Sequence, residues 1–293
     1  MSNPDSGKFD ASQFKIDQRK NWDGAAAGWQ KWWKTAEDGA QKISDKLVEL
    51  AEIKSGNRVL DVATGIGEPA ITAARIVGEK GYVLATDISP QMLAIGRERA
   101  MSHGLQDIIE FKEGDAELVD LPNATFQAAI CRWGLMFLPN LSIALSNIQK
   151  SLVSGGKFAT AVWADPSKVP LISLSLSTVR KQLNIPAPPP NVPSPFSLAD
   201  VDMFTSTLSQ AGFGDIHNES VEVTFEFNSP EDYVKYTQDI SAPIKLMLAN
   251  ETEMRREEIW KILGDRVRIQ YAANGGGSLR FKNEAICVVG QKK

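Results

Sequence analysis

A glycine-rich turn after an apolar run is the most informative feature of the sequence. The stretch VLDVATGIGEPA, residues 59–70, places Gly65 and Gly67 just before a segment with helical character. Glycines let the backbone approach a ligand closely, and the helix that follows would aim its first N–H groups at that ligand. The same string fits the dinucleotide-binding pattern G-x-G-x-x-A. It therefore predicts a nucleotide-like ligand without deciding which one.

Three acidic residues narrow the choice of ligand. Asp87 ends the second apolar run, 20 residues after Gly67, where a carboxylate can accept hydrogen bonds from both hydroxyls of an adenosine ribose. Asp61 precedes Gly65 by four residues, and a carboxylate there suits a cationic ligand better than a diphosphate. Asp115 follows the third apolar run and could accept a bond from an exocyclic amine. Together they favour a cationic adenosyl ligand.

These motifs resemble those of class I S-adenosylmethionine-dependent methyltransferases, closest to the ubiquinone/menaquinone-biosynthesis-like (methyltransferase type 11) group. The resemblance covers roughly residues 58–164, and residues 213–227 and 283–290 would complete the sheet. It implies S-adenosyl-L-methionine as cofactor and S-adenosyl-L-homocysteine as product. The cofactor-binding residues that it implies are Asp61, Ala63, Gly65, Gly67, Asp87, Ile88, Asp115, Ala116 and Cys131.

Within this resemblance the loop from Asp61 to Gly67 lies beside the methionine part of the cofactor. Asp87 and Ile88 hold the ribose and flank the adenine, and Asp115 and Ala116 contact the adenine amine. Arg132 and Trp133 follow the fourth strand, near the sulfonium and the acceptor. Glu68 and Pro69 depart from the pattern, since relatives often carry small or hydroxyl residues there.

Aromatic side chains are the candidates for binding the methyl acceptor. Trp22, Trp29, Trp32 and Trp33 fall at spacings of seven, three and four, which predicts a shared helical face. That face would either pack on the core or close as a lid over an apolar acceptor, sparing the cofactor site. The predicted acceptor-binding residues are Trp29, Trp33, Trp133 and Phe137.

Catalysis is expected to rest on positioning. A methyl group on a sulfonium is already activated, so alignment of the acceptor and exclusion of water can supply most of the acceleration. The only histidines are His103 and His217, and neither is expected to be an essential base. The candidates for a catalytic role are Arg132, Trp133 and His217; for Arg132 an ion pair at a sheet end is an equal alternative.

The elements that must position these residues alternate between strand and helix. This alternation predicts an α/β, doubly wound, Rossmann-like sheet of seven mostly parallel strands, with ligands at the carboxyl ends of the strands. A further helix is expected over 198–212, with Ser197 and Asp200 as a capping pair. The expected strands are 58–64, 82–87, 108–115, 128–133, 157–164, 219–227 and 283–290.

Two domains are expected: an N-terminal helical cap or lid over 1–55, and the Rossmann-like domain over 56–293. Segments at about 165–196 and 228–279 match no part of the regular pattern, and we expect them to be insertions that cover the substrate site.

Composition excludes several other classes. The 293 residues carry a net charge of −4, which disfavours nucleic acid as a partner. Two cysteines and two histidines argue against a disulfide scaffold and against a zinc site. The N-terminal residues are polar, and no apolar run approaches the roughly 18 residues that a membrane span needs. We expect a cytoplasmic enzyme with a small-molecule acceptor and no metal; the sequence leaves its oligomeric state open.

Two other functions use the same motifs. An NAD(P)-dependent oxidoreductase would need the glycine-rich turn but would leave Asp61 and Asp115 without a role. A noncatalytic protein that binds an adenosyl ligand would need no cavity under the aromatic segment. Titration with S-adenosylhomocysteine and with NADH separates the first alternative from a methyltransferase.

Overall fold

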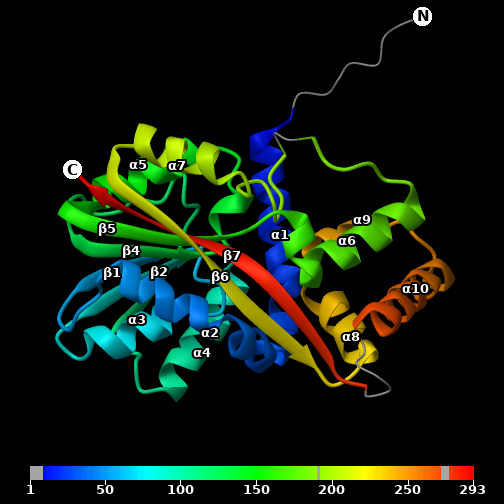
Figure 1. Ribbon diagram of the computed structural model, residues 1–293. Coiled ribbons are helices and arrows are strands. Elements are labelled where there is room, and N and C mark those ends of the chain that lie inside the picture. The colour runs from blue at the N-terminus through cyan, green and yellow to red at the C-terminus, as the bar shows by residue number, and fades with distance from the viewer. Residues whose placement is uncertain (1–8, 190–191, 272–276) are drawn as a thin grey trace, which may run out of the picture.

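The protein is built on one twisted sheet at the centre of the computed structural model, which describes residues 9–189, 192–271 and 277–293 (Figure 1). In this part of the chain seven strands run in the order β3-β2-β1-β4-β5-β7-β6, with β7 antiparallel to its neighbours. This confirms the expected doubly wound, mostly parallel sheet. The strands are β1 Arg58–Val62, β2 Tyr82–Asp87, β3 Ile109–Glu113, β4 Phe126–Arg132, β5 Leu152–Trp163, β6 Phe213–Phe227 and β7 Leu279–Lys292.

The strand order reverses between β1 and β4. The chain moves outward from β1 through β2 to β3 and then returns to place β4 on the other side of β1. Open parallel sheets bind their ligands at such a point, because the loops that leave the two central strands turn to opposite faces and open a crevice. The crevice here lies at the carboxyl ends of β1, β2 and β4.

Helices cover both faces of the sheet. Figure 1 shows α2, α3 and α4 on one face and α5 and α7 on the other, as a doubly wound fold requires. The main helices are α1 Ala11–Lys31, α2 Trp33–Leu50, α3 Ala70–Val77, α4 Pro90–Ser102, α5 Leu141–Ser151, α6 Pro170–Leu183, α7 Val201–Gln210, α8 Pro230–Ile240, α9 Ala242–Met247 and α10 Glu253–Tyr271; short 3-10 turns η1 Leu135–Phe137 and η2 Pro166–Lys168 join them.

Local capping explains where several helices begin. The Ser89 hydroxyl accepts the N–H of Met92 at the start of α4, where Pro90 occupies the first turn, as the sequence predicts. The expected pairing of Ser197 with Asp200 is wrong. Asp200 alone caps α7, which begins at Val201, because the Ser197 hydroxyl is engaged in a local turn with Ser194.

The predicted N-terminal cap divides into two unlike helices. Ile43 and Leu47 of α2 are fully buried and belong to the main core, and burial of each such side chain contributes about 1.5–3 kcal/mol. Helix α2 is therefore a covering layer of the sheet. Helix α1 instead crosses the strand ends between the sheet and the remaining helices (Figure 1). The domain boundary at residue 55 stays a prediction.

The two irregular segments of the sequence meet in space. Helix α6, from the first, packs against α9 and α10 from the second (Figure 1). The Tyr233 hydroxyl of α8 donates to the Leu171 carbonyl of α6 at 2.8 Å, and Leu176 and Ile259 share a buried cluster. The helices of the two segments, α6 and α8 to α10, thus form one helical layer beside the strand ends, which we call the helical cap.

Candidate active site

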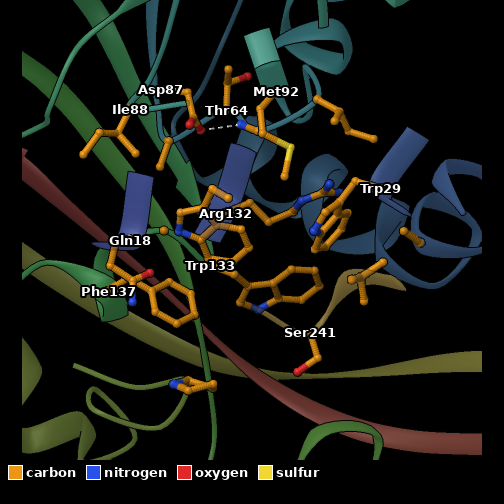
Figure 2. Close-up of a pocket in the computed structure, with 18 of the residues that line it drawn as sticks. Gln18, Trp29, Thr64, Asp87, Ile88, Met92, Arg132, Trp133, Phe137 and Ser241 are labelled. Carbon is orange, nitrogen blue, oxygen red and sulfur yellow. Dashed lines mark hydrogen bonds between the residues drawn. The ribbon is translucent and has the colours of Figure 1, made fainter. Parts of the chain in front are cut away.

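A cavity of about 280 Å³ opens where the strand ends, helix α1 and the helical cap meet (Figure 2). Its walls come from the loops that follow β1, β2, β3 and β4, and from α1, α6, α8 and α9. The structure thus brings together most of the residues that the sequence singled out. Those that line the cavity are Trp29, Ala63, Gly65, Asp87, Ile88, Asp115, Ala116, Arg132, Trp133 and Phe137.

Two predicted residues lie outside the cavity. Trp33 is 41% exposed, and its ring lies 5.1 Å from the Arg99 guanidinium. Helix α1 ends at Lys31 and a new helix begins at Trp33, so the four N-terminal tryptophans do not share one face as expected. His217 is exposed on β6, in register with Val289 and away from the cavity wall.

Three more predicted residues support the wall from behind. The buried Asp61 accepts the Ala70 N–H at 2.9 Å through Oδ2, and its side chain also interacts with the Thr64 hydroxyl. Burial raises the pKa of Asp61 to about 8. Gly67 has φ of +100°, and an added Cβ would come within 3.3 Å of the Gly96 backbone. Burial raises the pKa of Cys131 to about 12, so its thiol is unreactive.

Asp87 organises the loops at the nucleotide end. Its Oδ2 accepts the Gly65 N–H at 2.8 Å and its Oδ1 accepts the Ser89 N–H at 2.9 Å. Each carboxylate oxygen keeps a lone pair for a further donor, and the side chain faces the cavity (Figure 2). Burial raises the pKa of Asp87 to about 6. The carboxylate is therefore rigidly held and can still accept bonds from a pair of hydroxyls.

Helix α1 contributes residues that the sequence reading missed. The Lys15 ammonium lies 2.8 Å from Asp115 Oδ2 and 2.9 Å from Glu117 Oε2. Ser89 donates to Asp23 at 2.6 Å. The spacing of these residues along one face of a helix could have indicated their role in the sequence. The cavity-facing residues on α1 are Lys15, Gln18, Trp22 and Trp29. Helix α1 is thereby bonded to the loops after β2 and β3.

Arg132 forms a buried ion pair. Its guanidinium donates to both carboxylate oxygens of Glu37, at 3.1 and 2.9 Å, and to the Ser44 hydroxyl at 2.8 Å. Burial alone would lower the pKa of Arg132, but the nearby Glu37, Glu68 and Asp61 side chains together outweigh burial, and the pKa is raised. Of the two readings of Arg132, the ion pair is the one that the structure contains.

Trp133 is held in an uncommon conformation. Its φ is +59°, in the left-handed region that bulky residues rarely adopt, and such strain gathers at functional sites. The indole stacks on Trp163 with centroids 4.1 Å apart, while its buried N–H has no partner among the described residues. Nearby, Phe137 meets Trp22 of α1 edge-on at 5.3 Å. These rings form an aromatic compartment next to the nucleotide end.

Helix α3 has its first N–H groups occupied by carboxylates. Asp61 accepts from Ala70, and Glu68 accepts from Thr72 at 3.2 Å and from its hydroxyl at 2.7 Å. In dinucleotide-binding folds the pyrophosphate occupies this helix start. Two carboxyl groups therefore already occupy the place and the donors that a diphosphate would use.

In residues 9–189, 192–271 and 277–293, no three His, Cys, Asp or Glu side chains gather as metal ligands would. No helix in those ranges is both long and apolar enough to cross a membrane.

The chain is similar to known methyltransferases over its central part. Residues 40–178 match the model of the ubiE/COQ5 methyltransferase family. The ubiquinone/menaquinone biosynthesis C-methyltransferase UbiE of Pseudomonas putida is 34% identical over 120 residues, which are 41% of this chain and 47% of that protein. The chain thus spans about half the length of the relatives it matches.

Solved structures extend the likeness of fold to most of the chain. Phosphoethanolamine N-methyltransferase 2 of Haemonchus contortus, solved with S-adenosyl-L-methionine, has a TM-score of 0.60 at 17% identity and covers 99% of this chain and 61% of its own. The cyclase SpnF has a TM-score of 0.53 at 17% identity, covering 86% and 81%. At such identities the likeness shows the fold alone. The match of residues 40–178 confirms the resemblance read from the motifs: over this part, the chain is similar to the ubiE/COQ5 methyltransferase family.

Proposed function

We propose that the protein transfers a methyl group from S-adenosyl-L-methionine to a small, apolar or aromatic acceptor. The main support for the proposal is that a single cavity extends from Asp87, the proposed ribose-binding carboxylate, to the stacked rings of Trp133 and Trp163. A nucleotide end and an apolar end in one cavity suit two reactants that must meet.

The residues of the cavity fit this cofactor. Asp87 would hold the ribose hydroxyls, Ile88 would flank the adenine, and Asp115 would accept from the adenine amine. Two buried indole N–H groups in the cavity wall, those of Trp29 and Trp133, have no partner among the described residues. Leaving buried polar atoms unpaired is costly, so their concentration here supports a polar ligand.

The charge of the wall favours a cation. Among the residues that line the cavity, Lys15 and Arg132 are cationic, against four carboxylates: Glu37, Glu68, Asp87 and Asp115. S-adenosyl-L-methionine, when bound, supplies a methyl group on a positively charged sulfonium. A net negative wall attracts that charge, and the same wall repels a diphosphate.

The chain's own residues would act by alignment and by exclusion of water. Trp133 is fixed by its stacking on Trp163 and can present a flat apolar surface to the acceptor. Trp22 meets Phe137 from across the cavity, so α1 serves as the aromatic lid. Water removed from such a compartment cannot solvate the nucleophile. No histidine lines the cavity in the described part of the chain, in keeping with a mechanism without a histidine base.

Two measurements test the proposal. In the first, calorimetric titration should give saturable binding of S-adenosylhomocysteine and no binding of NADH; tight binding of NADH alone would support the oxidoreductase instead. In the second, a small-molecule extract is incubated with the protein and methyl-tritiated S-adenosyl-L-methionine. Label should enter an apolar extractable product. Binding without any transfer would favour a noncatalytic adenosyl-binding protein.

A further inference from the structure

Helix α1 covers the amino-acid end of the proposed cofactor site as well as the acceptor. Trp29 packs against Ile66, Met92 and Ile95, so its indole lies against the glycine-rich loop and α4 (Figure 2). By the motif resemblance, that loop lies beside the methionine part of the cofactor. A residue predicted to bind the acceptor is therefore placed where the cofactor's amino-acid end would lie.

The carboxylate of that amino-acid end needs hydrogen-bond donors, and the cations of the wall are already engaged. Lys15 pairs with Asp115 and Glu117, and Arg132 pairs with both oxygens of Glu37. Moving Arg132 to a ligand would leave the buried Glu37 carboxylate without its cation, which is strongly unfavourable, and Lys15 is held by two carboxylates at once. The carboxylate must then be met by neutral donors.

Backbone donors of the glycine-rich loop are largely used as well. The Thr64 N–H donates to the Thr86 carbonyl at 2.9 Å, and the Gly67 N–H donates to the Thr64 carbonyl at 3.0 Å. The Gly65 N–H is taken by Asp87 at 2.8 Å. These bonds shape the loop, so a ligand could not claim them without unfolding the turn.

One side-chain donor remains at this end. The Thr64 hydroxyl is engaged with the buried Asp61 side chain, whereas the buried Trp29 indole N–H lines the cavity and has no partner among the described residues. We propose that the Trp29 indole binds the carboxylate of the cofactor's amino-acid end, so that helix α1 supplies a cofactor ligand. This inference rests on the proposed function.

The consequence is a link between the lid and the cofactor. Trp29 lies on the same helix as Trp22, whose ring contacts Phe137 at the aromatic compartment. A bound carboxylate would hold α1 in the closed position by its bond to Trp29. The acceptor compartment would then be complete only when the cofactor is in place.

The test compares two adenosyl ligands by titration calorimetry. S-adenosylhomocysteine carries the amino-acid end, and 5′-methylthioadenosine lacks it. Trp29→Phe keeps an aromatic ring but removes the N–H together with the five-membered ring, and the second ligand controls for the lost packing. The variant should weaken S-adenosylhomocysteine about ten- to a hundredfold, as expected for a hydrogen bond to a charged group. Binding of 5′-methylthioadenosine should change by less than about twofold.

Trp260→Phe serves as the matched control, since Trp260 lies in α10 outside the cavity; both affinities should be unchanged. Unchanged S-adenosylhomocysteine binding in Trp29→Phe overturns the inference but leaves the proposed function standing. Equal weakening of both ligands also overturns it, because the indole would then act only as packing. If the unaltered protein binds neither ligand, the proposed function itself fails.

Discussion

The fit of helix α1 against α8 can be tested with two glycines of the same helix. An added Cβ at Gly28 would lie 2.2 Å from the Asp239 carbonyl oxygen, whereas one at Gly24 would meet nothing within 4 Å. Ordinary contact begins near 3.4 Å, so Gly28→Ala must push α1 away by roughly 1 Å. That shift would strain the bond from the Trp32 indole to Asp239, now 2.7 Å, and displace the neighbouring Trp29.

The magnitudes follow from two opposing effects. Replacing glycine by alanine inside a helix stabilises by about 1 kcal/mol, and both variants gain this. Only Gly28→Ala also suffers overpacking, which costs about 1–3 kcal/mol. Gly24→Ala should therefore exceed Gly28→Ala in the free energy of unfolding by about 1–3 kcal/mol.

Urea denaturation of the unliganded proteins measures this difference, and calorimetry with S-adenosylhomocysteine measures its consequence. The Gly28→Ala protein should bind this ligand roughly tenfold more weakly, because a displaced indole loses its bond to the carboxylate. The Gly24→Ala protein should bind like the original. Equal stability and equal affinity in the two variants would refute the tight contact between α1 and α8 and the reasoning built on it.

Four further predictions concern single side chains. Asp87→Ala should weaken both S-adenosylhomocysteine and 5′-methylthioadenosine by about two to four decades, since two charge-assisted bonds to the ribose are lost; unchanged calorimetric affinities would disprove that role. The pKa of Asp87 near 6 means that its carboxylate is ionised above pH 6 and protonated below it, so affinity for S-adenosylhomocysteine should fall about tenfold between pH 7 and pH 5. Burial raises the pKa of Asp61 to about 8, above its value in the unfolded chain. The stabilisation from its protonated form is therefore full at low pH and is lost as the pH rises toward 8. In urea unfolding, the free energy of unfolding of Asp61→Asn relative to the original protein should rise by about 1.4 kcal/mol per pH unit between pH 5 and pH 8. His103→Ala and His217→Ala should each keep label transfer within about tenfold, below the range of general base catalysis, and a thousandfold loss in either folded variant would establish a histidine base.

The nucleotide end of the site was readable from the sequence because its parts are local. Asp61, the glycine-rich turn and the start of α3 lie within ten residues of one another, and Asp87 ends the next strand. Their hydrogen bonds join strand ends to the loops that follow them. A strand–turn–helix unit folds in much the same way wherever it occurs, so residue type and spacing carry the geometry.

The course of the N-terminal helices was not readable in this way. The spacing of the four tryptophans suits a single helical face, but the helix is interrupted at Trp32, whose indole donates to Asp239 at 2.7 Å across 207 residues. That interruption turns Trp33 outward, toward Arg99. Helical periodicity in a sequence assumes a continuous helix. It does not reveal that Trp32, where this helix is interrupted, bonds to Asp239 on a distant element.

The alternating sheet, the glycine-rich turn and the strand-end carboxylates of the nucleotide end could thus be predicted from residue types and spacing. The other walls of the cavity close through contacts between distant elements. Arg132 is neutralised by Glu37 across 95 residues, and Lys15 reaches Glu117 across 102. Trp29 is set against the glycine-rich loop by the packing of α1 on α4 and α8. Such pairings depend on how whole helices pack against the sheet, and packing depends on long-range shape complementarity that short patterns do not encode.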